Sequence, residues 1–337
     1  MKKTFLYFCL LFIVQTAFAA DSLYVREQQI PILIDRIDNV LYEMRIPAQK
    51  GDVLNEITIQ IGDNVDLSDI QAIRLFYSGV EAPSRKGEHF SPVTYISSHI
   101  PGNTRKALES YSVRQDEVTT PLSRTVKLTS KQPMLKGINY FWVSIQMKPE
   151  TSLLAKVATT MPNAQINNKP IDITWKGKVD ERHVGIGVRQ AGDDGSAAFR
   201  IPGLVTTNNG TLLGVYDIRY NSSVDLQEKI DIGVSRSTDK GQTWEPMRVA
   251  MTFKQTDGLP HGQNGVGDPS ILVDEKTNTI WVVAAWTHGM GNERAWWNSM
   301  PGMTPDETAQ LMLVKSEDDG KTWSEPVSYT HLRAHET

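Results

Sequence analysis

Two stretches of the sequence share one pattern and decide the expected fold: DIGVSRSTDKGQTW at 231–244 and LMLVKSEDDGKTW at 311–323. Each is a short apolar strand that leads into the motif S-x-D-x-G-x-T-W. The matched positions are Ser237, Asp239, Gly241, Thr243 and Trp244 in the first copy, and Ser316, Asp318, Gly320, Thr322 and Trp323 in the second. The pattern predicts a hairpin turn in which Asp accepts backbone N–H bonds, Gly adopts a conformation closed to other residues and Trp packs beneath. Its role is structural, not catalytic.

A recurring hairpin motif predicts repeated four-stranded units, which is the organisation of a β-propeller with blades of about 40 to 50 residues. Ser237 and Ser316 lie about 79 residues apart, which exceeds one blade. Either a blade without the motif intervenes or a long loop does, and we favour a loop at 287–307. Upstream, Asn209 and Gly210 lie between apolar runs at 203–219 and predict a tight hairpin turn.

The preceding region, 21–176, consists of short runs with alternating or β-branched residues, separated by Gly, Pro, Asn and Asp. Strands are expected at 56–62, 72–79, 124–130 and 139–147. This period-2 pattern predicts a β-sandwich, which is also a candidate carbohydrate-binding domain. Its aromatic residues are expected in the core rather than on a sugar-stacking platform: Phe76, Tyr77, Phe141 and Trp142. The polar stretch 162–194 is interpreted as a linker, with the propeller blades at 182–327.

Composition and the N-terminus set the broad class. The 337 residues are 39% hydrophobic and 22% charged, as in globular proteins, and a net charge of −4 provides no basic field for nucleic acid.

Residues 1–19 carry two lysines, an apolar run and an Ala-x-Ala site, which predict a secretory signal peptide too short to span a bilayer. We therefore expect an exported protein, periplasmic, cell-surface or secreted, without a transmembrane segment. The only cysteine, Cys9, lies in this leader.

A tetrapeptide, F-R-I-P at 199–202, precedes the first motif and is followed by a glycine and a strand. With the two turn motifs, it resembles the bacterial sialidases (exo-α-sialidases, or neuraminidases), in particular those of Bacteroidetes with an N-terminal sandwich. The resemblance runs from Leu23 to about Val327. It implies an all-β protein, an N-terminal β-sandwich followed by a six-bladed β-propeller, here incomplete. It also implies hydrolysis of terminal sialic acid from sialylated glycans with retention, without a cofactor.

The resemblance assigns residues one by one. The arginine of the tetrapeptide is the first of three that grip the substrate carboxylate, and Arg200 matches it; the second lies about nineteen residues on, at Arg219. A guanidinium suits this role because its planar fork bonds both carboxylate oxygens. The general acid/base aspartate matches Asp225 in the following loop, where burial or a neighbouring carboxylate is expected to keep it partly protonated. Glu228 and Asp231 are weaker competitors.

A fourth match, Asp268 in GVGDPSILVD, corresponds to a family residue near the acetamido group of the sugar, although Asp before Pro is also a common turn device. Three tryptophans are candidates either for the aglycone side or for packing within the loop: Trp286, Trp296 and Trp297. His261 and His288 have no second ligand at metal-binding spacing, so no metal is expected.

In the family, a tyrosine nucleophile, its glutamate partner and the third arginine all follow the second turn motif. Beyond Trp323 the only tyrosine is Tyr329 and the only arginine is Arg333. Both lie in YTHLRAHET, so 328–337 is interpreted as a non-native tail and neither is assigned. We therefore expect a C-terminally truncated chain that does not turn over substrate. The alternative is a non-catalytic glycan-binding protein with a propeller scaffold. The F-R-I-P tetrapeptide with Arg219 and Asp225 at family spacing favours the enzyme.

Overall fold

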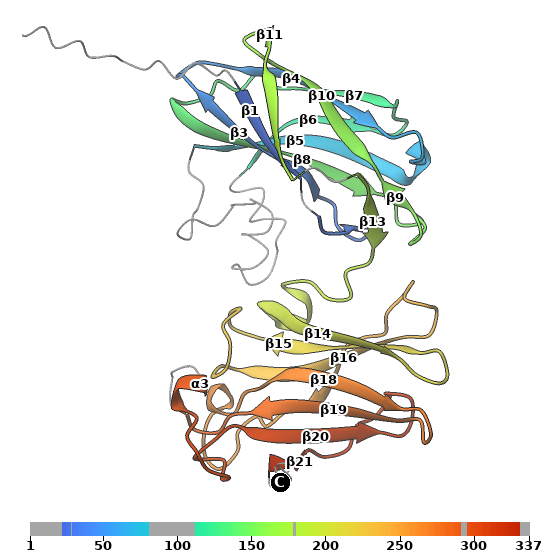
Figure 1. Cartoon of the computed structure of the whole chain (residues 1–337), viewed down its shortest axis with the longest axis vertical. Coiled ribbons are helices and arrows are strands. Elements are labelled where there is room, and N and C mark those ends of the chain that lie inside the picture. The colour runs from blue at the N-terminus through green and yellow to red at the C-terminus, as the bar shows by residue number, and fades with distance from the viewer. Residues whose placement is uncertain (1–21, 28, 81–111, 178–179, 291–294, 331–337) are drawn as a thin grey trace, which may run out of the picture.

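The computed structural model describes residues 22–27, 29–80, 112–177, 180–290 and 295–330, which form two lobes (Figure 1). Within these ranges the protein is all-β: the only α-helix is the four-residue α3 (Ala295–Asn298), accompanied by short 3-10 turns. None of the helices in these ranges is long and apolar enough to cross a membrane. The leader at 1–19, Cys9 and Arg333 lie outside the described residues.

Two sheets form most of the first lobe. The six-stranded sheet has the order β12 (Asp172–Lys176), β1 (Ser22–Glu27), β3 (Asn39–Ala48), β8 (Gly137–Met147), β5 (Ile70–Gly79) and β6 (Val113–Thr119). The four-stranded sheet has the order β11 (Lys169–Pro170), β10 (Thr159–Ile166), β4 (Leu54–Ile61) and β7 (Thr125–Thr129). A small third sheet joins β2 (Ile32–Leu33), β13 (Arg182–Gly185) and β9 (Lys156–Val157).

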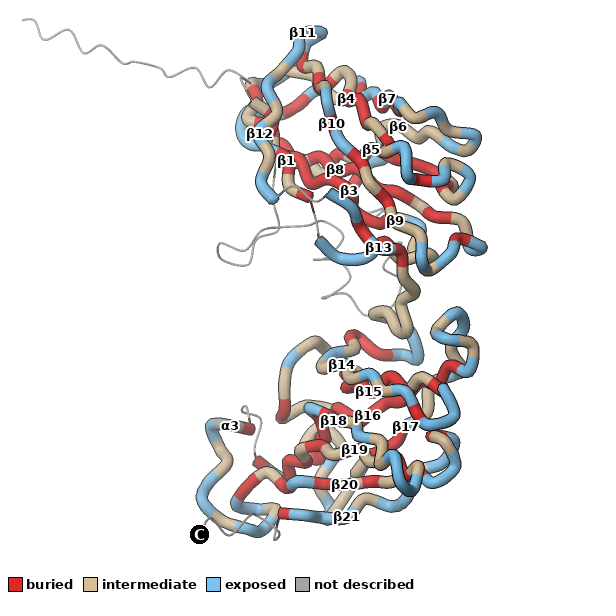
Figure 2. The backbone as a smooth tube through the Cα atoms, turned by 45° about the vertical axis from the view of Figure 1, so that its right-hand side comes forward, coloured by how far each residue is buried: buried red, intermediate tan, exposed pale blue. Residues whose placement is uncertain are grey.

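Alternate residues of the two larger sheets meet in one apolar core, because successive side chains of a strand point to opposite faces. Ile57 and Ile59 from β4 share this core with Ile73 and Leu75 from β5, and Figure 2 shows the buried positions along these strands. The arrangement is a sandwich of two sheets over a common core.

The four aromatic residues singled out above in the first lobe pack as expected for core residues. Tyr77 and Phe141 belong to the shared core. Phe76 and Trp142 lie on the other face of the six-stranded sheet, where their rings stack 4.0 Å apart, and Trp142 is fully buried. They therefore present no exposed platform for stacking a sugar.

The connection between the lobes is shorter than the polar stretch at 162–194 suggested. β12 pairs in parallel with β1, and β13 pairs with both β2 and β9, so both strands belong to the first lobe. The second lobe therefore begins after Gly185 rather than at residue 182. The connection is held to the first lobe by Asp35, which accepts hydrogen bonds from Gln190 Nε2 at 2.7 Å and Gly187 N at 3.3 Å.

The second lobe contains two antiparallel sheets whose strands follow one another in chain order. The first meander consists of β14 (Ala198–Thr206), β15 (Leu212–Arg219), β16 (Ile230–Ser237) and β17 (Arg248–Met251). The second meander consists of β18 (Val266–Asp274), β19 (Thr279–Trp286), β20 (Gln310–Ser316) and β21 (Val327–Ser328). Because β19 pairs directly with β20, from Trp286 opposite Gln310 onward, the extra residues between the two turn motifs form a loop, as expected.

Both S-x-D-x-G-x-T-W motifs form the same turn. Asp239 accepts hydrogen bonds from Thr243 N and Oγ1 at 2.9 and 2.6 Å, and these bonds lower the pKa of Asp239 to about 2. Gly241 N donates to Ser237 Oγ at 2.8 Å, with φ at +86°. In the second copy, burial of Asp318 raises its pKa, but the bonds from Thr322 and its neighbours outweigh that effect and lower it to about 2. Trp244 is half-buried beside Gly214, and Trp323 packs on the apolar core of the second lobe.

The two meanders pack against each other through one apolar layer. Leu213 and Val215 of β15, with Ile232 and Val234 of β16, pack with apolar residues of the second meander. Since alternate residues share a face, Asp217 and Arg219 continue the β15 face at one end of this layer, and Arg236 continues the β16 face at the other. The interface is therefore apolar at its centre and charged at both ends.

Candidate active site

The candidate site begins with a buried ion pair at the end of β15. The side chain of Arg219 is 1% exposed and that of Asp217 is 0% exposed. Nε and Nη2 of Arg219 donate to Asp217 Oδ2 at 3.0 and 2.7 Å. Because Asp217 and Arg219 are two residues apart on one strand, they lie on the same face, and their opposite charges make burial at the interface tolerable.

Arg200 lies beside this pair on β14, directly opposite Asp217 in the ladder. The register shifts between Arg200 and Gly203, which is a bulge, and Ile201 within it has φ of +53°. A β-branched residue in the left-handed region is strained, and such strain is concentrated at functional sites. The bulge leaves the Arg200 side chain 42% exposed, so solvent reaches its guanidinium while Arg219 lies behind.

The loop between β15 and β16 carries Asp225 onto both arginines. Asp225 Oδ1 accepts from Arg200 Nη1 at 2.8 Å and from Arg219 Nη1 at 2.7 Å. The same two nitrogens donate to the carbonyl of Ser223, at 3.0 and 2.9 Å. Asp225 itself is 38% exposed. Two guanidinium groups thus converge on one carboxylate at the surface. This differs from the expected surroundings of a partly protonated acid, because neighbouring cations favour the ionised form of a carboxylate.

Asp268 reaches the site from the second meander, at a β-bulge like the one beside Arg200. In β18 the register shifts between Gly267 and Ser270, and Asp268 has φ of +57° and precedes a proline, as Ile201 does in β14. The backbone N–H of Asp268 donates to Asp217 Oδ1 at 2.9 Å, and its side chain is exposed. The four residues predicted from the sequence are therefore brought together, and Asp217 connects them.

Asp217 is the residue that the sequence analysis missed. Burial raises the pKa of Asp217 to about 6, against the opposing hydrogen bonds and charge of Arg219. The available signal was its position two residues before Arg219, because an Asp-x-Arg pair in an otherwise apolar strand predicts a same-face ion pair. A single polar residue in an apolar strand is also compatible with an exposed strand face, so the signal was weak.

The competing residues have local partners. Glu228 Oε1 accepts from Asn221 Nδ2 and from the backbone of Lys229. Asp231 is buried and makes contacts of 2.9 Å with the Tyr220 hydroxyl and His261 Nε2. Neither reaches the two arginines through a hydrogen bond.

His288 and Trp286 have partners other than the two arginines. His288 Nδ1 lies 2.8 Å from Asn264 Oδ1. Trp286 is buried and stacks on Phe253, whereas Trp297 is 66% exposed; the side chain of Trp296 lies outside the described residues. Within the described ranges, no three His, Cys, Asp or Glu side chains are grouped so that they could hold a metal ion.

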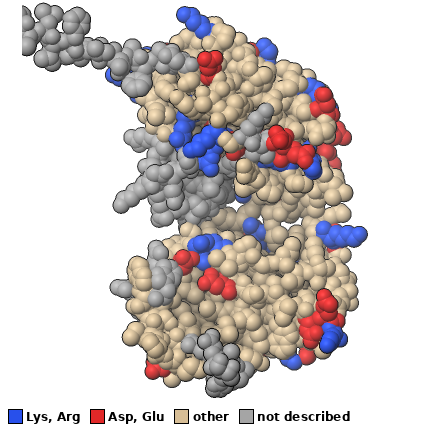
Figure 3. All heavy atoms as spheres, in the orientation of Figure 1, with Lys and Arg blue, Asp and Glu red and all other residues tan. Residues whose placement is uncertain are grey.

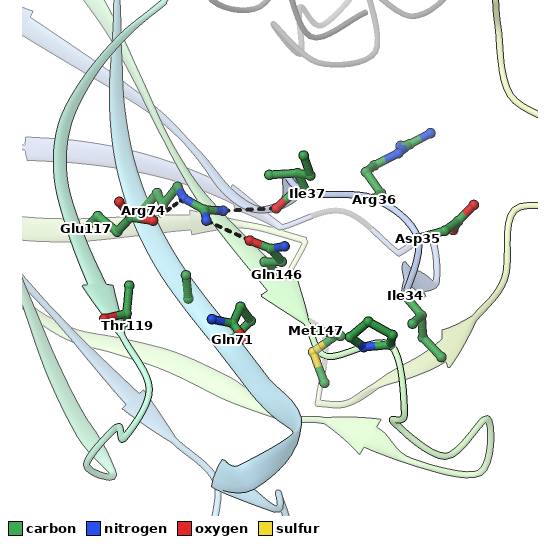
Figure 4. A pocket seen from close by; sticks show the side chains of 12 residues that line it. Ile34, Asp35, Arg36, Ile37, Gln71, Arg74, Glu117, Thr119, Gln146 and Met147 are labelled. Atoms are coloured by element: carbon green, nitrogen blue, oxygen red, sulfur yellow. Dashed lines mark hydrogen bonds and ion pairs between the residues drawn. The ribbon is translucent and has the colours of Figure 1, made fainter.

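A separate hollow of about 400 Å³ lies on the first lobe, beside Arg74 and the loop at 34–37 (Figure 4). The Arg74 guanidinium is hydrogen-bonded to other residues that line this hollow. It donates to Glu117 Oε1 at 2.7 Å, to Gln146 Oε1 at 2.6 Å and to the carbonyl of Ile37 at 3.0 Å. These bonds tie β5 to its neighbours. On the face shown in Figure 3, acidic and basic side chains are interspersed, and neither sign forms one continuous patch.

Both lobes of the chain are similar to known proteins. A family model described as the N-terminal domain of BNR-repeat neuraminidase matches residues 20–170, and one described as a BNR repeat-like domain matches residues 201–336. A sialidase of Bacteroides fragilis is 56% identical over 336 residues, which is 98% of this chain and 61% of that protein. A sialidase of Paraclostridium sordellii is 36% identical over 136 residues, which is 40% of this chain and 31% of that protein.

A solved structure, that of the Hadza microbial sialidase Hz136, is 60% identical and superposes with a TM-score of 0.77 over 91% of this chain and 60% of that one. Consecutive meanders with S-x-D-x-G-x-T-W turns and a two-arginine site define a BNR-repeat, or Asp-box, protein. The chain belongs to the bacterial sialidase (BNR-repeat neuraminidase) family. It spans about three fifths of the length of the relatives that it matches over most of its residues.

Proposed function

We propose that this chain provides part of the active site of an exo-α-sialidase, which hydrolyses terminal α-linked sialic acid from glycoconjugates with retention. The observation that carries the proposal is the convergence of Arg200 and Arg219 on one surface carboxylate oxygen, at 2.8 and 2.7 Å. Sialic acid carries a carboxylate beside its anomeric carbon, and paired guanidinium groups recognise carboxylates through charge-assisted hydrogen bonds. The relatives named sialidase support the same chemistry.

The geometry suggests how binding prepares the acid. Without substrate, the carboxylate of Asp225 takes the Nη1 donors of both arginines. A sialoside carboxylate that approaches the exposed Arg200 competes for the same donors, and its negative charge offsets the arginine charge felt by Asp225. Both effects favour the protonated form of Asp225. Asp225 then donates its proton to the departing glycosidic oxygen and later removes a proton from the incoming water.

We also propose the finer architecture and the location. The two meanders are the first two blades of a six-bladed propeller, a proposal supported by their four-stranded chain-order topology and their shared apolar layer. Asp268 lines the substrate pocket from the second blade, as the family resemblance suggests. The leader pattern at 1–19 supports export to the periplasm, the cell surface or the medium.

The test is a hydrolysis assay. The genomic reading frame that contains residues 1–327 is expressed to its stop codon, and sialic acid release from 3′- and 6′-sialyllactose is measured. We expect release by the wild type and a loss of roughly 10²- to 10⁴-fold in Asp225→Ala, the range for removal of a general acid.

Glu245→Ala is the matched control, because Glu245 is a comparably exposed carboxylate that also pairs with an arginine, Arg236, at the other end of the interface. It should retain wild-type activity. Absence of sialic acid release by the wild type from both substrates would contradict the proposed function.

A further inference from the structure

Asp217 occupies the end of the apolar layer between the two meanders. It continues the β15 face of Leu213 and Val215, and its side chain is fully buried. Gly267 of the second meander borders this carboxylate: a methyl group there would be in ordinary van der Waals contact with both oxygens, at 3.4 Å. The carboxylate is therefore enclosed by protein from both meanders.

Each oxygen of Asp217 holds a different part of the candidate site. Oδ2 accepts from Nε and Nη2 of Arg219, which leaves Nη1 directed at Asp225 and the Ser223 carbonyl. Oδ1 accepts the backbone N–H of Asp268. The carboxylate thereby fixes the plane of the Arg219 guanidinium and the backbone from which the Asp268 side chain projects.

Asp217 also determines how firmly Arg219 holds Asp225. A buried guanidinium requires a counterion, and Asp217 supplies one within the interface. Of the two carboxylates bonded to Arg219 in the hydrogen bonds described above, only Asp225 would carry a charge if Asp217 were neutral. The charge of Arg219 would then favour the ionised form of Asp225 more strongly. Such an aspartate would be a poorer proton donor.

We propose that Asp217 is a positioning residue of the sialidase reaction: it orients and neutralises Arg219, and thereby sets both the place of Asp225 and its readiness to donate a proton. This inference rests on the proposed function. Asp217 does not touch the substrate; it acts through Arg219 and through the backbone of Asp268.

The experiment uses two substrates that need the acid to different degrees. Sialyllactose has a poor leaving group and requires protonation of the glycosidic oxygen, whereas an aryl sialoside with an acidic phenol requires little. We expect Asp217→Asn to lower kcat on sialyllactose by about 10- to 100-fold, the scale for a misplaced catalytic group. On the aryl sialoside the loss should be less than about 10-fold.

Asp319→Asn is the matched control, because Asp319 also pairs with a buried arginine across the meander interface but lies at the opposite end. It should lower the melting temperature and leave the ratio of the two kcat values as in the wild type. Loss of folded protein scales both rates equally, so a changed ratio separates positioning from stability. If Asp217→Asn does not fold, Asp217→Glu, which keeps the charge but displaces the carboxylate by one methylene, should change the ratio in the same direction.

The outcomes separate the two proposals. A wild type inactive on both substrates overturns the proposed function, and the role of Asp217 with it. An active wild type whose ratio changes in Asp225→Ala but not in folded Asp217→Asn overturns the positioning role alone. If Asp217→Asn does not fold, an unchanged ratio in folded Asp217→Glu overturns it.

Discussion

The two ends of the meander interface have similar ion chemistry but different surroundings. One end holds the open cluster (Arg200, Asp217, Arg219 and Asp225), and the other holds the closed cluster (Arg236, Glu245 and Asp319). Each contains an arginine that continues the apolar face of a strand, and in each that arginine is almost fully buried, at 1% and 4% exposure.

The clusters differ in how their carboxylates are satisfied. In the closed cluster, Asp319 of the second meander accepts from the hydroxyls of Thr207 and Thr211 at 2.6 and 2.5 Å and from Arg236 Nη2 at 3.0 Å. Arg236 Nε also donates to the carbonyl of Asp319, at 2.7 Å. These bonds join the turn of one meander to the β14–β15 hairpin turn and to β16 of the other.

Both ends also place an arginine and a carboxylate at the surface: Arg200 with Asp225 at the open end, and Arg248 with Glu245 at the closed end. Arg200 and Asp225 are exposed enough for a solute to replace their contact, whereas Asp217 and Arg219 are enclosed. The comparison shows that a buried arginine does not by itself indicate a binding site, because both ends have one. The distinguishing feature is that both arginines of the open cluster share one oxygen of Asp225, whereas Arg236 and Arg248 bond different oxygens of Glu245. The second carboxylate of the open cluster, Asp217, is also fully buried.

The largest stability difference between the clusters is expected from removal of the buried arginines. Arg219→Ala leaves Asp217 buried with no cation and should reduce the free energy of unfolding by about 3–5 kcal/mol. Arg236→Ala leaves Asp319 with two hydroxyl donors, so the loss should be smaller, about 2 kcal/mol. Urea denaturation followed by tryptophan fluorescence measures both. Equal losses, or a larger loss in Arg236→Ala, would show that Asp217 does not depend on Arg219.

A smaller and more selective effect is expected from the exposed arginine. Arg200→Ala should weaken inhibition by free sialic acid by about 10- to 100-fold, since a hydrogen bond between charged groups contributes about 1.5–3 kcal/mol. Its melting temperature should hardly change, because exposed ion pairs contribute little. The control is Arg248→Ala: Arg248 is 38% exposed and pairs with Glu245 at the closed end. Weaker inhibition in both variants would indicate a general charge effect rather than a site.

The comparison also shows what the sequence could reveal. Arg200, Arg219, Asp225 and Asp268 were found because motifs with family spacing mark them, and the structure brings them within one hydrogen-bonded group. Their catalytic and binding roles stay predictions. Asp217 carries no such mark, because its importance arises from the opposite meander: the N–H of Asp268 and the proximity of Gly267 appear only once the two sheets pack.

Long-range pairing limited the prediction of the fold in the same way. The local pattern predicted strands at 72–79 and 139–147, and the structure has β5 and β8 there. The polar stretch after residue 162 was interpreted as a linker because its composition is that of a loop. β13 nevertheless forms as part of the first lobe, because β2, which lies far away in the sequence, supplies hydrogen-bonding partners for its backbone.

The smallest effects expected are pH dependences, and their signs differ between the two ends. Asp318, in the turn beside Asp319, has its folded pKa lowered to about 2, below the unfolded value of about 3.9. Its ionised form therefore contributes stability above about pH 4, and this contribution is lost as pH falls through 2. Asp217 has its folded pKa raised to about 6, so its contribution is present below about pH 4 and is lost as pH rises through 6.

Unfolding free energies of wild type, Asp318→Asn and Asp217→Asn, measured from pH 2 to 8, test both signs. The wild type should lose stability relative to Asp318→Asn on acidification below pH 4, and relative to Asp217→Asn as pH rises from 4 to 6. If the wild type instead becomes more stable relative to Asp217→Asn between pH 4 and 6, the charge of Arg219 lowers the pKa of Asp217 by more than burial raises it. The open cluster would then be held as firmly as the closed one, and Asp225 rather than Asp217 would be its adjustable carboxylate.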